Sequence, residues 1–227
     1  AAAAGRLTAG EARCVRRGSS GMPALRLALL ATALASFDAA AQPPAGAAAA
    51  PPDSIEDVVL HPVVGPHVVC LEHPLGQLRS LGDALGADCL VPDLAAGPMG
   101  RWPVFYRGDG RRNEDWYGWG VAVLAPFDGV VDSVHVNGVT NRPGVLGTAR
   151  ASVIVFRRAD GVRALYAHVR DIRVQKGDSV RAGKPVARVG NNGPAWFPHT
   201  HVGAWKGERP LQVRFDLRAM GRLRRSD

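Results

Sequence analysis

The segment "ASVIVFRRADGVRALYAHV" (residues 151–169) holds two alternating apolar runs around a tight turn signal. Residues 151–158 and 163–169 are rich in β-branched and aromatic side chains, which favour strands. Between them, "RADG" (158–161) contains the Asp-Gly pair that is typical of a short hairpin turn. The segment therefore predicts a β-hairpin.

Short runs of the same kind recur from residue 101 onward, separated by Gly, Pro, Asn and Asp. They cover residues 103–107, 122–126, 129–136, 172–175, 185–190 and 199–205. Many short strands with turn residues between them are typical of an all-β sandwich or barrel. We therefore predict an all-β domain over residues 101–217, mainly an antiparallel twisted sheet or sandwich, followed by a basic tail over 218–227.

Residues 54–100 have a different character and predict a small mixed α/β N-terminal extension. "DSIEDVV" (53–59) has the pattern of a short helix, and "HVVCLEHPL" (67–75) has that of a strand. "LGQLRSLGDALG" (75–86) has the spacing of an amphipathic helix that ends at its last glycine. Three histidines of this extension lack motif spacing and are interpreted as surface or packing residues: His61, His67 and His73.

The composition is that of a globular protein. The chain has 227 residues, of which 46% are hydrophobic and 21% charged, enough for one domain with extensions. The formal net charge of +8 indicates a general attraction to anionic surfaces. No cluster of Lys and Arg alternates with aromatic residues, so we do not expect the chain to bind nucleic acid.

The N-terminal region has the pattern of a secretory signal peptide. In "MPALRLALLATALASFDAAAQPP" (22–44), a short basic start precedes an apolar run and a small-residue end. We expect Met22 to be the start and cleavage to follow Ala41, so that residues 1–41 are an upstream segment plus signal peptide. Residues 42–53 would then be a Pro/Ala linker. The apolar run is too short for a membrane span. The sequence thus predicts an exported, periplasmic or extracellular protein with no membrane span in the mature chain.

Two cysteines remain after this cleavage, Cys70 and Cys89. In an oxidising compartment they can form a disulfide, while the alternative is two separate buried thiols. The sequence gives no distance between them, so both alternatives stay open.

The residues with chemistry to offer lie mainly in "WFPHTHVGAW" (196–205). In an extended chain, His199 and His201 point to the same face of the strand. A third histidine, His168, lies in another strand, and Asp115 lies in "RRNEDWYGWG" (111–120). One carboxylate and two or three imidazoles on a β scaffold suit a catalytic zinc with an open position for water.

Five short motifs occur in one order along the chain: "APFDGVV" (125–131), "YAH" (166–168), "GDSVRAG" (177–183), "VGNNG" (189–193) and "PHTH" (198–201). In this order they resemble the lysostaphin/LytM-type zinc metalloendopeptidases, which are peptidoglycan hydrolases. The resemblance covers about residues 105–206. It implies a twisted antiparallel sheet whose loops wall a long groove.

The resemblance also implies roles for the four residues. Asp115 and His201 would be ligands of one Zn²⁺ ion. His168 and His199 would be catalytic residues that do not bind the metal. They would orient the attacking water and stabilise the tetrahedral transition state. Imidazoles suit this work because their pKa lies near 6.5, close to physiological pH.

One position departs from the family pattern. The family's first ligand is a histidine four residues before the aspartate, and here that position is Arg111. Asn113 shares the face of Asp115 in an extended chain and is the remaining nearby donor, although a carboxamide oxygen is a poor ligand for zinc.

Two functions therefore stay open. The first is an exported zinc-dependent endopeptidase that hydrolyses peptide bonds in bacterial cell-wall peptidoglycan by metal-activated water. The second is a degenerate, non-catalytic member of the family that binds the cell wall or activates another hydrolase.

A third interpretation starts from "VQKGDSVRAGKPVARVG" (174–190), which resembles the hairpins of biotinyl and lipoyl carrier domains. Lys184 lacks the flanking Met residues of those domains, and the histidines would stay unexplained.

Overall fold

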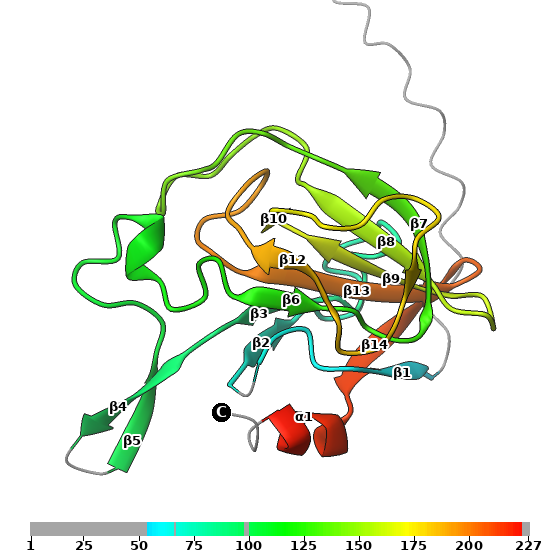
Figure 1. Ribbon diagram of the computed structural model, residues 1–227, viewed down its shortest axis with the longest axis horizontal. Helices are drawn as coiled ribbons and strands as arrows, with labels where there is room; N and C mark the ends of the chain where they lie inside the picture. The colour runs from blue at the N-terminus through cyan, green and yellow to red at the C-terminus, as the bar shows by residue number, and fades with distance from the viewer. Residues whose placement is uncertain (1–53, 66, 98–99, 224–227) are drawn as a thin grey trace, which may run out of the picture. The chain divides into compact units, whose positions relative to one another are not determined.

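The computed structural model describes residues 54–65, 67–97 and 100–223 (Figure 1). The expected upstream segment, signal peptide and Pro/Ala linker lie outside the described residues, as do the last four residues of the basic tail. The regular secondary structure of the described part is almost wholly β-strand, so the all-β prediction is confirmed.

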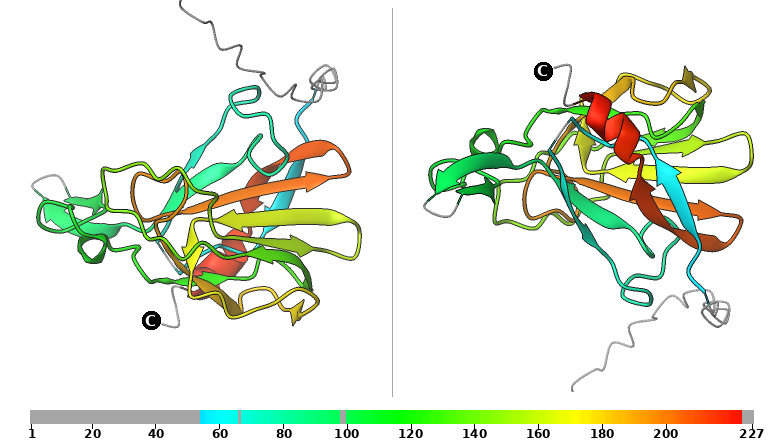
Figure 2. Two further views of the ribbon diagram at one scale, coloured as in Figure 1. Left: turned by 90° about the horizontal axis from the view of Figure 1, so that it is seen from above. Right: turned by 90° about the horizontal axis from the view of Figure 1, so that it is seen from below.

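A main sheet of nine strands dominates the fold (Figures 1 and 2). Seven of them run in the order β1 (Asp57–Leu60), β14 (Arg209–Phe215), β13 (Thr200–Lys206), β9 (Val162–Ala167), β8 (Val153–Arg157), β7 (Gly129–His135) and β11 (Ser179–Val180). The two remaining strands are β3 (Ala87–Leu90), which also pairs with β13, and β2 (Val69–Glu72), which pairs with β3. Neighbouring strands are antiparallel except for β1 and β14, which are parallel.

A second, three-stranded sheet packs against the first. Its order is β10 (Val169–Arg170), β12 (Pro185–Val189) and β6 (Ala122–Leu124). Side chains of both sheets share one buried cluster, which includes Val123, Val186 and Val189 from the small sheet and Phe156 and Tyr166 from the large one. The core therefore lies between two sheets, as in a β-sandwich.

The remaining elements lie outside these two sheets. They are the hairpin of β4 (Asp93–Gly97) and β5 (Gly100–Val104), a 3₁₀ turn η1 (Asn113–Asp115), and one α-helix, α1 (Leu217–Leu223). Within the described ranges, no helix has the length and hydrophobicity needed to cross a membrane.

The hairpin predicted from "RADG" is present between β8 and β9. The N–H of Arg158 donates to the carbonyl of Val162 at 2.8 Å, and Gly161 takes a positive φ of 88°. The carboxylate of Asp160 accepts a hydrogen bond from the N–H of Val162 at 3.2 Å. The turn residues thus act as their sequence indicates, since Asp bonds its own backbone and Gly adopts the left-handed conformation.

The two helices expected in the extension are wrong. Residues 57–60 form strand β1, and residues 75–86 form a series of turns. In the second segment, Gly76, Gly82 and Leu85 have φ angles of +87°, +95° and +57°, which no right-handed helix contains. The apolar spacing was misleading because Ala84 and Leu85 are buried in a turn and not on a helix face.

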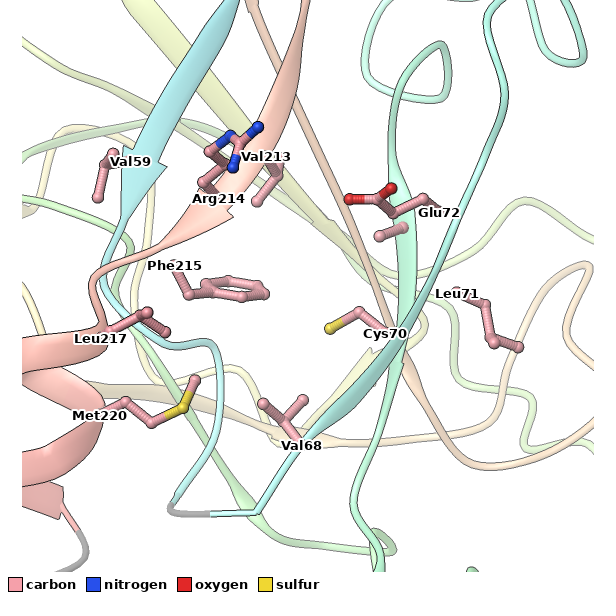
Figure 3. A pocket seen from close by; sticks show the side chains of 11 residues that line it. Val59, Val68, Cys70, Leu71, Glu72, Val213, Arg214, Phe215, Leu217 and Met220 are labelled. Carbon is pink, nitrogen blue, oxygen red and sulfur yellow. The ribbon is translucent and has the colours of Figure 1, made fainter.

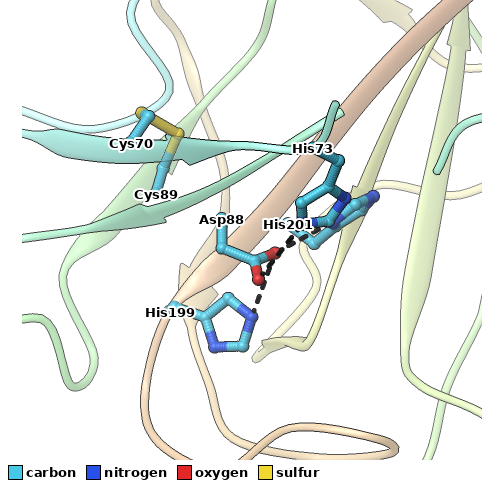
Figure 4. The surroundings of a disulfide bond; sticks show 6 residues. All are labelled: Cys70, His73, Asp88, Cys89, His199 and His201. Atoms are coloured by element: carbon cyan, nitrogen blue, oxygen red, sulfur yellow. Dashed lines mark hydrogen bonds and ion pairs between the residues drawn. A yellow bond between two sulfur atoms is a disulfide. The ribbon is translucent and has the colours of Figure 1, made fainter. Parts of the chain in front are cut away.

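Cys70 and Cys89 form a disulfide, which resolves the alternatives that the sequence left open (Figure 4). The two residues lie directly opposite each other in the β2–β3 pair, with Cα atoms 4.1 Å apart. The bond ties β2 and β3 of the extension together next to β13.

Two different strands, β3 and β14, pair with the same edge of β13. Strand β3 pairs with residues 200–202 of β13, and β14 pairs with residues 204–206 on the same edge. Where the two branches separate, a cavity of about 670 Å³ opens between β2, β14 and α1 (Figure 3). Its lining is mainly apolar and includes Val59, Cys70, Val213, Phe215 and Met220.

Candidate metal centre and catalytic site

Strand β13 places His201 between two other strands. In the register of the sheet, His201 lies opposite Ala167 of β9 on one side and Asp88 of β3 on the other. Directly opposite residues in an antiparallel pair have side chains about 5 Å apart. The pairing of β3 with β13 therefore brings an aspartate of the extension to the predicted zinc-ligand histidine.

His73 joins them from the residue that follows β2. Its N–H donates to the carbonyl of Gly86 at 2.8 Å, which fixes the backbone just beyond the strand. The ring of His73 stacks on that of His201, with centroids 5.2 Å apart and an angle of 29° between the planes. The turns of residues 75–86 thus return the chain so that His73 and Asp88 meet.

Asp88 is the centre of the cluster (Figure 4). Its Oδ1 accepts a hydrogen bond from Nδ1 of His201 at 2.9 Å and lies 3.5 Å from Nε2 of His199. Its Oδ2 lies 3.4 Å from Nε2 of His73. One carboxylate therefore faces three imidazoles, although its side chain keeps 31% of its surface exposed.

His168 completes the group from the end of β9. Its φ is +62°, a conformation that is uncommon outside glycine and that separates β9 from β10. The side chain of Asn192 holds this bend, since its Nδ2 donates to the carbonyls of His168 and Val169 at 3.2 and 2.9 Å. Backbone strain of this kind is concentrated at functional sites. The rings of His168 and His199 lie 4.6 Å apart.

In each of the four imidazole rings, one nitrogen lies near a backbone carbonyl. The other nitrogen faces Asp88 or the cavity. The contacts are His73 Nδ1 to Asp83 (3.4 Å), His168 Nδ1 to Asn192 (2.8 Å), His199 Nδ1 to Phe197 (2.8 Å) and His201 Nε2 to Gly82 (3.0 Å). A hydrogen bond from one ring nitrogen fixes the tautomer and the orientation of the other. The four rings are therefore oriented before any ligand binds.

The charges of the cluster shift the ionisation of its members. Burial alone would raise the pKa of the Asp88 carboxyl, but hydrogen bonds from His199 and His201 outweigh it and hold that pKa well below its usual range. Burial opposes the protonation of His201, yet hydrogen bonds to Asp83 and Asp88 raise its pKa to about 9. Burial lowers the pKa of His168 to about 3, with a smaller contribution from His199. The site therefore holds a carboxylate and a neutral imidazole side by side at neutral pH.

These side chains line a cavity of about 880 Å³. The cluster is at its inner wall, and the rest of the lining comes from turns 78–83, the loop of residues 148–151, and residues 194–197. The long polar loop of residues 137–150 therefore borders the site through its C-terminal part.

The structure brings together three of the five predicted site residues, His168, His199 and His201. Neither Asp115 nor Asn113 lines the cavity. Asp115 lies in η1, where its Oδ2 accepts a hydrogen bond from the N–H of Arg112 at 3.0 Å. The amide of Asn113 bonds the carbonyl of Asn141 and the side chain of Asn191 at 2.8 and 2.9 Å.

Two residues that the sequence did not indicate take part, His73 and Asp88. A signal for Asp88 was available, because it is the one charged residue in the apolar strand "ADCL" (87–90). His73, which was interpreted as a surface or packing residue, has no comparable signal because it lies just after β2 and outside any motif. Four residues before Asp88, where the family has its histidine, stands the buried Ala84. The third donor beside Asp88 and His201 is instead His73, which follows the other strand of the β2–β3 pair.

The donor set fits a metal ion. One ligand atom each from His73, Asp88 and His201 lie within 4.8 Å of one another. Donors about 2.1 Å from a tetrahedral cation are about 3.4 Å apart, which is close to the 3.4 Å between His73 and Asp88 and the 2.9 Å between His201 and Asp88. Two imidazoles and one carboxylate, with a fourth position facing a cavity, are the ligand set of catalytic zinc sites.

Fold and site together define a β-sheet protein with a cluster of imidazoles and one carboxylate at a cavity, and part of its sequence matches a known family. Residues 117–213 match the model of Peptidase family M23, which confirms the resemblance drawn from the motifs. The match contains His168, His199 and His201 and begins after both Asp88 and Asp115. No curated protein matches the chain.

Several solved structures are similar. A variant catalytic domain of the prophage-encoded M23 protein EnpA from Enterococcus faecalis is 24% identical, with a TM-score of 0.42, over 65% of this chain and 87% of that one. The catalytic domain of lysostaphin from Staphylococcus simulans is 21% identical, with a TM-score of 0.34, over 65% and 79%. The SpoIIQ–SpoIIIAH pore-forming complex contains a chain 16% identical, with a TM-score of 0.44, over 70% and 89%.

Proposed function

We propose that this protein is an exported zinc-dependent endopeptidase that hydrolyses peptide bonds of bacterial cell-wall peptidoglycan. The observation that carries the proposal is the cluster of Asp88 and four imidazoles, each ring oriented by a backbone carbonyl, at the wall of one cavity. The match to a peptidase family supports the class of reaction. The disulfide supports an oxidising compartment and hence export.

In this proposal His73, Asp88 and His201 hold the zinc ion. When bound, zinc polarises a peptide carbonyl and activates water for attack at neutral pH. Nδ1 of His201, which lies 2.9 Å from Oδ1 of Asp88, would be the ligand nitrogen of this histidine. The carbonyl of Gly82 keeps the far nitrogen of His201 in place, as partners of ligating histidines commonly do.

His168 and His199 do the proton transfer. With the Nδ1 proton of His168 held by the carbonyl of Asn192, its Nε2 is free to accept a proton from the attacking water. Burial keeps this imidazole neutral, which such a base requires. His199 has the same arrangement through Phe197 and presents its Nε2 on the same side as Asp88. When Nε2 of His199 also carries a proton, it can donate a hydrogen bond to the oxygen that gains charge in the tetrahedral transition state.

A second candidate function is a non-catalytic member of the family that binds the cell wall or activates another hydrolase. One observation favours it: neither candidate aspartate is preceded by the family's histidine, since Arg111 and Ala84 occupy those positions. Arg111 is 83% exposed and pairs with Asp109.

Two measurements on the purified protein distinguish the candidates. We expect one zinc ion per chain by elemental analysis, and clearing of a suspension of purified sacculi that stops after chelation. The matched control is His61→Ala, which should behave as wild type, while His201→Ala should lose both properties. A protein that binds sacculi but holds no zinc and releases no peptide would instead be the non-catalytic member.

A further inference from the structure

A second, smaller cavity of about 340 Å³ lies beside the histidine cavity. The two cavities share Trp196 and Phe197 in their linings. The remaining walls come from residues 106–116 and from residues 143–144 of the long polar loop. In Figure 1 these segments (green, yellow-green and orange) meet around η1 and the loop that precedes β13.

Aromatic rings form a continuous row from the outer edge of this small cavity to the catalytic histidines. Tyr106 and Trp116 have ring centroids 5.0 Å apart, and Trp116 stacks on Phe197 at 5.1 Å with planes 10° apart. Phe197 in turn lies 5.4 Å from the ring of His199. A molecule bound along this row would therefore reach the reacting groups.

Hydrogen bonds fix the row in position. Nε1 of Trp116 donates to the carbonyl of Gly110 at 2.9 Å. Gly110 has a φ of +66°, and a side chain there would meet the ring of Tyr106 at 2.8 Å, so only glycine suits this turn. The carbonyl of Trp196 accepts a hydrogen bond from Gly144 at 2.8 Å. The cavity is preorganised, which lowers the entropic cost of binding.

The row nevertheless leaves large aromatic surfaces in contact with water. Tyr106 of the row is 46% exposed, and Trp196, which also lines the cavity, is 52% exposed. At the rim, the carboxylate of Asp109 lies 3.5 Å from the guanidinium of Arg111. The cavity thus offers apolar ring faces together with one strong hydrogen-bond acceptor and one strong donor.

We propose that this cavity is a saccharide subsite that binds the N-acetylated amino sugars of the cell-wall glycan. The C–H face of a pyranose ring carries slight positive charge and suits the negative face of an aromatic ring. Its hydroxyl and acetamido groups need both donors and acceptors at the rim, which Arg111 and Asp109 supply. The inference rests on the proposed function, because it places a glycan strand next to the peptide that the histidine cavity receives.

The direct test is calorimetric titration of the purified protein with chitotetraose, the β-1,4 tetramer of N-acetylglucosamine. We expect saturable binding that Trp196→Ala and Tyr106→Ala each weaken about tenfold, as stacking contacts of this size do in other aromatic sites. Trp196→Phe should retain most of the affinity. The matched control is Trp102→Ala, because Trp102 is 53% exposed on β5 and does not line the cavity.

A second titration uses the Asp88→Asn variant, which should bind chitotetraose like wild type because the saccharide needs neither zinc nor catalysis. In the wild-type protein, saccharide binding without hydrolysis of sacculi would leave the subsite in place and reject only the peptidase function. Hydrolysis without saccharide binding would reject only the subsite. The inference also fails if Trp102→Ala weakens binding as much as Trp196→Ala, or if Trp196→Ala abolishes the binding of a free stem tetrapeptide instead.

Discussion

Two segments of this protein each contain a candidate aspartate, Asp88 in residues 73–88 and Asp115 in residues 109–116. The fold places the two side chains in different surroundings. In residues 73–88, the aspartate lies in a strand that pairs with β13. In residues 109–116, it lies in a 3₁₀ turn and bonds its own local backbone. The first faces three histidines, and the second is paired with an exposed arginine.

The difference shows that strand pairing decides which carboxylate reaches the histidines. Asp115 is the aspartate that the family resemblance indicated, but its segment does not pair with the strand of His201. Asp88 lacks a preceding histidine, yet it is the direct cross-strand neighbour of His201. We therefore place the metal at Asp88, and the experiments below test this choice against Asp115.

The largest expected effect is that of Asp88→Asn. Removing the charge should lower zinc affinity and the rate of sacculus hydrolysis by more than about 100-fold, because the carboxylate is both a ligand and the partner of three imidazoles. Zinc content and a turbidity assay measure the two effects. Asp115→Asn is the matched control and should change neither. If Asp115→Asn lowers zinc content and hydrolysis while Asp88→Asn changes neither, then Asp115 is the metal ligand.

His73→Ala comes next in expected size. It removes one of three protein ligands and leaves Asp88 and His201, so zinc affinity should fall about 10–100-fold while the other two still bind weakly. Competition with a chromophoric chelator measures this affinity directly, without any substrate. An unchanged affinity in His73→Ala would mean that the ring stacks on His201 without ligating.

The double substitution Cys70→Ser with Cys89→Ser tests what holds Asp88 in place. Loss of the disulfide should lower the free energy of unfolding by about 3 kcal/mol, as expected for a closed loop of this length. Because β3 carries Asp88 next to Cys89, zinc affinity should fall as well. Thermal denaturation with and without zinc separates the two effects. If stability falls but zinc affinity does not, the β3–β13 pairing alone positions the carboxylate.

The smallest expected effect concerns the other aspartate. Arg112→Ala removes the 3.7 Å pair between an exposed guanidinium and Asp115. Exposed pairs of this kind contribute little, so the free energy of unfolding should change by less than about 0.5 kcal/mol. Denaturant unfolding and the sacculus assay should both give wild-type values. A loss of hydrolysis here would mean that the 109–116 segment acts on the reaction.

Local sequence patterns predicted much of the sheet. The hairpin of β8 and β9 follows from alternating apolar residues and the Asp-Gly turn, whose effects operate over a few residues. His199 and His201 share a face because β13 is extended, and His168 was indicated by its motif. Strand β14 (Arg209–Phe215) lies within the predicted β domain but was missed as a strand, although Leu211, Val213 and Phe215 alternate.

The extension could not be predicted in the same way, because its structure depends on distant partners. Strand β3 is positioned by its pairing with β13. The turns of residues 75–86 are positioned by packing against β13. Gly203 shows this dependence, since any side chain there would meet the carbonyl of Gly82 at 1.6 Å. Nothing in the sequence around Gly82 or Gly203 indicates that the two residues lie in contact. The ligand set of the candidate metal centre is a product of this long-range packing.

The cross-strand contact between Asp88 and His201 joins residues 113 positions apart. Closing so long a loop costs chain entropy, and contacts of this kind form late when a β-sheet protein folds. During synthesis His201 emerges long after Asp88, so a nascent or truncated chain that ends before β13 contains only part of the ligand set. The proposed metal centre and the finished fold therefore arise in the same step.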